Sequence, residues 1–119
     1  MYEPLELDSG AGMAVLTLRG ELDAHDAPRL KDLLSGALER LGGTDDPCLV
    51  LDLTGVAFLD STALGTMVGA LRRVREAGGE MRVVLPETPA RRIFEITGLE
   101  DVLAVYASRE AALEAEPAG

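Results

Sequence analysis

The chain has 119 residues, which is enough for one domain and too few for a second hydrophobic core. Apolar residues make up 47% of the chain and aromatic residues only 3%, so the core must consist mainly of Leu, Val and Ala. The formal net charge of −10 repels nucleic acid and anionic membrane surfaces and favours a partner with a basic surface. On charge alone, simple solubility is the more economical explanation.

Several classes of site and location are excluded by residue counts and by the hydropathy pattern. The single Cys and single His allow neither a disulfide framework nor a zinc site of the usual Cys and His ligands. Cys48, in the apolar run CLVLDL, is predicted to be a buried strand residue. The start MYEPLELDSG does not resemble a secretory signal, and no apolar run approaches the roughly 20 residues of a membrane span. We therefore expect a cytoplasmic protein with no membrane segment, metal or cofactor.

The chain begins with two segments that are typical of strands. Residues 3–9 predict a short, irregular strand, and the better alternation of residues 13–19 predicts a second one. Ser9–Gly12 supplies the turn between them. Because the link is so short, we expect the two strands to be antiparallel neighbours.

A helix is predicted next, over residues 27–41. Asp26 is its candidate N-cap, and Pro28 suits its first turn. The glycine pair at 42–43 ends it. Its apolar stripe consists of Leu30, Leu33, Leu34, Ala37, Leu38 and Leu41.

The middle of the chain predicts a central strand followed by a second helix. Residues 48–53 form an unbroken apolar run, which indicates a strand covered on both faces. A turn is expected at residues 54–55, and a helix over 61–77 that ends at the glycine pair 78–79. The inward stripe of this helix consists of Leu64, Met67, Val68, Leu71 and Val74.

The rest of the chain continues to alternate strands and helices. A strand over 81–85, a helix over 88–97, a strand over 102–106 and a helix over 109–116 capped by Ser108 are predicted. The whole pattern indicates a single α/β domain, with a mixed, mostly parallel sheet that is entered by an antiparallel hairpin and packed with about four helices. The domain should span the full chain, with the last four residues frayed.

Motifs for catalysis are weak. Neither glycine pair is followed by the Lys-Ser/Thr of a phosphate-binding loop, and His25 has no second His with which to bind a metal. Glu21 and Asp23 follow Gly20 where a strand ends, a place where α/β folds often carry sites. Asp26 is explained as a helix cap, whereas no capping role is evident for Asp23.

The most informative segment is DLTGVAFLDSTALG, at residues 52–65. Its polar triplet Asp60, Ser61 and Thr62 comes immediately before the second helix. Helix capping alone explains such residues, at about 1 kcal/mol for a cap. The same place also suits an anion, because free N–H groups and the positive end of the helix dipole lie there. A phosphate on Ser61 could be held at this point and would alter the binding of a partner docked over it.

Four segments together resemble the STAS-domain family of bacterial anti-sigma factor antagonists. They are GELD at 20–23, AP at 27–28, FLDST-LG at 58–65 and RRIFEITGL at 91–99. The resemblance extends over nearly the whole chain, and the order and spacing of the segments make it specific. It implies a sheet packed with helices and no catalytic activity.

The resemblance also implies a partner and a switch. The unphosphorylated domain would bind an anti-sigma factor with serine kinase activity and so free a sigma factor. That kinase would phosphorylate Ser61, or its neighbour Thr62, and a phosphatase would reverse the reaction. Asp23 would lie near the switch serine. The implied partner surface consists of Asp23, Asp60, Ser61, Thr62, Ala63, Leu64 and Gly65.

One position departs from the family motif, because Ala63 stands where Gly is usual. A methyl group there favours the helix slightly but would oppose close approach by a partner. A poorly phosphorylated, persistently active antagonist is therefore an open alternative.

Two other functions compete with a phosphorylation-controlled antagonist. One is a non-catalytic STAS scaffold subunit of a stress-sensing or transporter complex. The other is a hydrolase or transferase, for which the sequence offers no obvious nucleophile and base pair.

Overall fold

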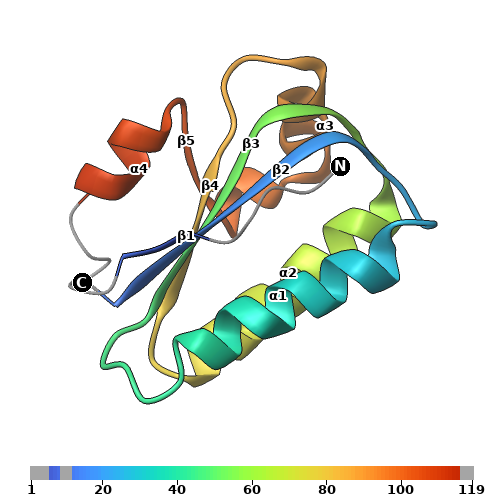
Figure 1. Ribbon diagram of the computed structural model, residues 1–119. Coiled ribbons are helices and arrows are strands. Elements are labelled where there is room, and N and C mark those ends of the chain that lie inside the picture. Colours follow the sequence, from blue (N-terminus) through green and yellow to red (C-terminus); the bar gives the residue numbers. More distant parts are fainter. Residues whose placement is uncertain (1–5, 9–11, 116–119) are drawn as a thin grey trace.

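The computed structural model describes residues 6–8 and 12–115, which form one sheet with helices on both faces (Figure 1). The strands are β1 (Glu6–Asp8), β2 (Met13–Leu22), β3 (Cys48–Leu59), β4 (Glu80–Val84) and β5 (Ala104–Tyr106). The helices are α1 (Ala27–Arg40), α2 (Ser61–Glu76), α3 (Pro89–Thr97) and α4 (Arg109–Glu114), with a 3₁₀ turn at Leu99–Asp101. The predicted frayed end at 116–119 and most of the predicted turn at Ser9–Gly12 lie outside the described residues.

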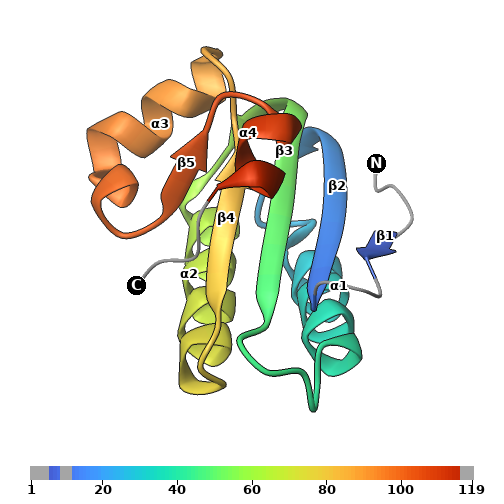
Figure 2. The same ribbon diagram turned by 90° about the vertical axis from the view of Figure 1, so that its left-hand side faces the viewer.

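The strands lie in the sheet in the same order as in the chain, β1-β2-β3-β4-β5, as Figure 2 shows from the side of α4. Strands β2 to β5 are parallel, and β1 pairs antiparallel with β2, with Glu6 opposite Val15. The prediction that residues 48–53 form the central strand is confirmed. Short β5 begins later than predicted, because the 3₁₀ turn holds the Leu103 amide to the Leu99 carbonyl at 2.8 Å.

The core lies on both sides of β3, as the unbroken apolar run predicted. Leu49, Leu51 and Leu53 pack in the larger core with α1, α2 and α3, while Cys48 and Val50 pack on the other face with α4. The stripe of α2 is buried as expected at four positions, Leu64, Met67, Leu71 and Val74. Val68 is only half-buried, so its predicted inward position is wrong, and Ala70 is buried instead.

The turn that we expected at residues 54–55 does not form, and β3 continues to Leu59. Strand β2 runs beside it to Leu22, with register shifts before Arg19 and after Gly20. Pairing with β2 therefore overrides the local turn preference. At the first shift Gly55 lies against Arg19, where an added Cβ would meet the Arg19 Cγ at 3.0 Å. The consequence is that both strands end together, at Leu22 and Leu59, beneath the candidate site.

Polar side chains cap three of the four helices, and the caps at Asp60 and Ser108 were expected from the sequence. Asp60, Thr88 and Ser108 accept hydrogen bonds from the first-turn amides of α2, α3 and α4. The predicted cap of α1 is wrong, because Asp26 has helical backbone angles and its side chain makes no capping hydrogen bond. Gly98, with a φ of 74°, ends α3 in the left-handed conformation that glycine favours.

Candidate partner-binding site

Two loops meet where β2 and β3 end. The β2–α1 loop begins after Leu22, and the amide of Asp60 donates to the Leu22 carbonyl at 3.1 Å. Because parallel strands deliver their following segments to the same edge of the sheet, this loop lies beside the start of α2 (Figure 1). The two segments singled out from the sequence, 20–23 and 58–65, are therefore brought together.

The carboxylate of Asp60 fastens the two segments to each other. Its Oδ1 accepts from the Ala63 amide at 2.9 Å, which caps α2. Its Oδ2 accepts from the Ala24 amide at 2.8 Å, which holds the β2–α1 loop. Both oxygens of one side chain are thus used, one for each segment.

Asp23 orders the same loop from within. Its Oδ1 accepts from the amides of His25, at 2.9 Å, and Asp26, at 3.3 Å. The Asp26 carboxylate in turn accepts from the Asp23 amide at 3.3 Å. Asp23 therefore closes the turn that leads into α1. This local role was not evident from the sequence, where only a helix-cap role for Asp23 was considered and not found.

Ser61 and Thr62 form the exposed first turn of α2. Within the described part of the chain, the Ser61 hydroxyl makes no hydrogen bond, and no acceptor meets the backbone amides of Ser61 and Thr62. Asp60 supplies the cap alone, so the Ser61 side chain is not needed for it. A hydroxyl that is accessible at a helix start, beside unpaired amides, can accept a phosphoryl group and leave the cap intact.

The remaining residues of the implied partner surface divide by exposure. Gly65 is exposed, whereas the side chains of Ala63 and Leu64 are 0% and 5% exposed and pack in the core. The methyl of Ala63 therefore points away from the surface that a partner would meet. The expectation that this methyl opposes the approach of a partner is wrong, because its contacts are with the protein's own interior.

Phe58 is an exposed aromatic side chain beside the site and lies outside the partner surface expected from the sequence. It is 45% exposed, two residues before the cap of α2, and lies opposite Glu21 in the pairing of β2 with β3. Its exposure gave no signal in the sequence, because a large apolar residue beside a core is normally counted as buried. It adds apolar area to the edge where the two loops meet.

An ion pair on the opposite face of the sheet stabilises the fold and lies away from the candidate site. Asp52 is 6% exposed, and its carboxylate accepts from Arg109 Nε at 2.9 Å and from the Thr54 hydroxyl at 2.6 Å. Burial alone would raise the pKa of Asp52, but the hydrogen bonds from Thr54 and Arg109 outweigh it and hold the pKa below its usual value. Arg109 also donates to the Thr17 hydroxyl at 2.6 Å, so this cluster fastens α4 to β2 and β3.

Neither a metal site nor a membrane span is found in the described ranges 6–8 and 12–115. No group of three or more His, Cys, Asp or Glu side chains is placed to hold a metal ion there. None of the helices there is both long and apolar enough to cross a bilayer.

Comparison with known proteins places this geometry in a family. The model of the STAS domain matches residues 5–112, which is most of the chain. The chain belongs to the STAS domain family. A curated relative of this STAS domain, the anti-sigma-B factor antagonist of Listeria monocytogenes, is 38% identical over 86 residues, which cover 72% of each chain.

Two solved structures share the fold. An anti-sigma factor antagonist from Mycobacterium paratuberculosis has a TM-score of 0.76 and 28% identity, over 92% of this STAS domain and 90% of that chain. The Bacillus cell fate determinant SpoIIAA in its phosphorylated form has a TM-score of 0.68 and 24% identity, over 96% and 97% of the two chains.

Proposed function

We propose that this STAS domain is a cytoplasmic anti-sigma factor antagonist that is switched off by phosphorylation of Ser61. The observation that carries the proposal is the start of α2, where Asp60 alone makes the cap and the Ser61 hydroxyl is exposed beside open amides. The names of its relatives support the first half of the proposal, since they are anti-sigma factor antagonists.

The unphosphorylated domain would bind an anti-sigma factor that has serine kinase activity, and so release a sigma factor. The partner would contact the exposed first turn of α2 and the loop that Asp23 and Asp60 order. Phosphoryl transfer from ATP to Ser61 by this kinase would end the complex, and a phosphatase would restore it. The STAS domain itself performs no catalytic step in this cycle.

The switch has a simple electrostatic basis. A phosphoryl group adds roughly −1.5 to −2 charge, which the open amides of α2 and its dipole partly offset within the domain. Docking removes the water that would otherwise solvate this charge. A partner surface that fits a neutral hydroxyl would then bury an unpaired dianion beside the Asp60 carboxylate. The fold of SpoIIAA accommodates phosphorylation, which supports the same tolerance in this relative of its fold.

The test is calorimetric titration of the cognate anti-sigma factor kinase with wild type, Ser61→Asp and Ser61→Ala. We expect Ser61→Asp to lose most of its affinity, about tenfold or more, with its melting temperature unchanged. Ser61→Ala should bind as wild type and resist phosphorylation. Thr62→Ala is the matched control and should be phosphorylated normally.

Mass spectrometry after incubation with the kinase and ATP locates the phosphate. Phosphate on Thr62 alone would move the switch by one residue. Undiminished binding by Ser61→Asp, together with no phosphate on either residue, would overturn the switch and favour a scaffold subunit of a larger complex.

A further inference from the structure

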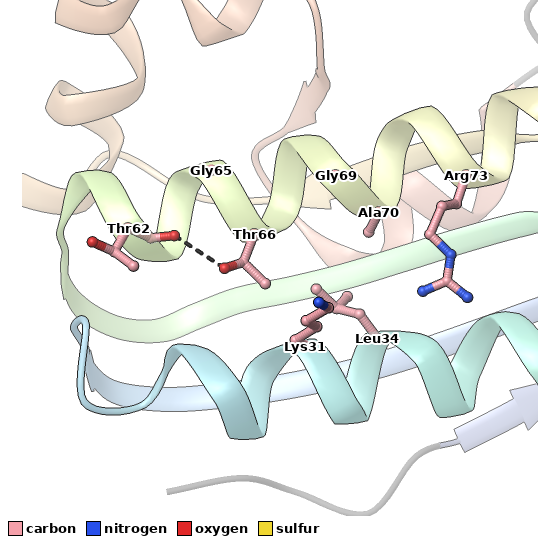
Figure 3. A pocket seen from close by; sticks show the side chains of 8 residues that line it. All are labelled: Lys31, Leu34, Thr62, Gly65, Thr66, Gly69, Ala70 and Arg73. Atoms are coloured by element: carbon pink, nitrogen blue, oxygen red, sulfur yellow. Dashed lines mark hydrogen bonds between the residues drawn. The ribbon is translucent and has the colours of Figure 1, made fainter.

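A groove runs between α1 and α2, starting beside the proposed switch (Figure 3). Its volume is about 380 Å³, and its residues come from one face of each helix. Lys31 and Leu34 of α1 point toward α2, and Arg73 of α2 points toward α1. The α2 residues that line it are Thr62, Gly65, Thr66, Gly69, Ala70 and Arg73, which recur at helical spacing.

Two glycines keep the α2 side of this groove open. Gly65 and Gly69 lie in the interior of α2, where each glycine costs about 0.5–1 kcal/mol relative to alanine. A Cβ atom added to either one would meet no atom within 4 Å. Packing inside the domain therefore does not require glycine at these positions. The effect of the two missing side chains is an open surface above Leu34 and Ala70, which are both buried apolar residues.

The groove carries positive charge in a chain of net charge −10. Lys31 is exposed on one side, and exposed Arg73 lies on the other, where its guanidinium donates to the Ser35 hydroxyl at 2.8 Å. This hydrogen bond uses one of the five N–H donors of Arg73 and fixes the guanidinium across the far end of the groove. The charge of the groove is thus opposite to that of the domain as a whole.

We propose that this groove binds an acidic segment of the anti-sigma factor, with an apolar side chain over Gly65 and Gly69 and carboxylates at Lys31 and Arg73. This inference rests on the proposed function and adds to it the place and chemistry of docking. Since the groove begins at Thr62, a segment seated in it extends to the first turn of α2. Docking in the groove would therefore place one defined part of the partner beside Ser61.

The first test fills the groove and measures binding of the cognate kinase by calorimetry. Gly69→Leu should weaken binding about tenfold or more, because its side chain occupies the space for the partner. Gly36→Leu is the matched control, since Gly36 is an α1 glycine outside the groove whose added Cβ also meets nothing within 4 Å. Both variants should keep at least the wild-type melting temperature. If Gly69→Leu bound the kinase as tightly as the control does, the proposal that the partner docks in the groove would be wrong.

Charge reversal tests the acidic nature of the segment. Arg73→Glu should weaken kinase binding much more than Arg72→Glu, which makes the same change of net charge at an exposed position on the same helix outside the groove. Equal effects of the two variants would mean that only the overall charge matters.

A peptide titration separates failure of the groove from failure of the proposed function. The probe is a short helical peptide with one central Leu flanked by Glu, and its control carries Lys in place of Glu. In NMR spectra of the wild-type domain, the Glu peptide should shift the amide signals of Gly65, Gly69 and Arg73, and the Lys peptide should not. If the kinase fails to bind wild type but these shifts occur, the function is wrong and the groove stands. If Ser61→Asp alone abolishes kinase binding and neither peptide shifts these signals, the function stands and the groove is wrong.

Discussion

At the residue scale, one carboxylate determines the shape of the site. Asp60 caps α2 with one oxygen and accepts from the Ala24 amide with the other, so it joins the start of α2 to the β2–α1 loop. Ser61 is the next residue, and its position is set by these hydrogen bonds of Asp60, to which its own side chain does not contribute. A modified side chain can therefore alter binding at this point while the fold stays the same.

Asp23 combines a structural role with the proposed binding role, and two substitutions can separate them. Asp23→Ala removes the acceptor for the His25 and Asp26 amides and should destabilise the domain by about 0.5–2 kcal/mol. Asp23→Asn keeps an acceptor oxygen and should cost less than about 0.5 kcal/mol. Urea denaturation gives both values, and titration with the kinase gives the binding of each variant. If Asp23→Asn binds as wild type, the negative charge has no part in recognition.

Asp52 should make the domain less stable as the pH falls into the acid range. Its folded-state pKa lies below the ordinary value of 3.8, so the ionised form stabilises the native state. This contribution is complete above the ordinary pKa and is lost as the pH falls through the lowered folded pKa. We expect the unfolding free energy of Asp52→Asn to fall less steeply than that of wild type below about pH 4. The unfolding free energies come from urea titrations at a series of pH values. If those of wild type and Asp52→Asn fell equally steeply below about pH 4, Asp52 would not contribute to the pH dependence of stability.

At the scale of elements, α2 is the helix that connects the core with the site. Leu64 and Leu71 are 5% and 3% exposed and pack in the larger core. Leu64→Ala and Leu71→Ala should each cost about 2–5 kcal/mol, because truncation leaves a cavity. Val68→Ala, at a half-buried position of the same helix, should cost about 1 kcal/mol or less. Chemical denaturation that gave all three variants the same small loss would mean that α2 is not held by this stripe.

The sequence predicted the helices well because α1 and α2 have regular apolar stripes, and because α2, α3 and α4 begin at polar residues typical of helix starts. The prediction of a cap at Asp26 failed, because two Asp residues lie close together before α1 and the sequence does not show which of them accepts the hydrogen bonds of the turn. The prediction of a turn at residues 54–55 also failed, because pairing with β2 is a long-range interaction that local turn preference does not report.

The site was predictable in part for the same reasons. Asp60, Ser61 and Thr62 are adjacent in the chain and precede a clear helix, so their common position followed from the pattern. The groove could not be predicted, because it depends on how closely α1 lies against α2. The inward direction of the Ala63 methyl likewise required the packed helix.

At the scale of the whole molecule, the two faces of the sheet differ in their proposed roles. Helices α1 and α2 lie on one face with the proposed switch and groove, and α4 covers the other (Figure 2). Helix α4 is fastened by Arg109 to Asp52, and by Arg82, which donates to the Ala112 carbonyl at 2.6 Å. Loosening α4 should therefore leave the switch face unaltered.

Cys48 reports on this separation, because it belongs to the buried cluster that includes Ala112 of α4, and burial raises the pKa of its thiol to about 11. A buried, protonated thiol is a poor nucleophile, so a thiol reagent should label Cys48 only when α4 opens or the domain unfolds. We expect Arg109→Ala to label several-fold faster than wild type at neutral pH, with kinase affinity unchanged. Arg72→Ala, at an exposed position of α2, is the control and should label as wild type does. Rapid labelling of the wild type would show that the thiol is accessible without opening. A loss of kinase affinity in Arg109→Ala at full stability would show instead that the two faces are coupled through β3.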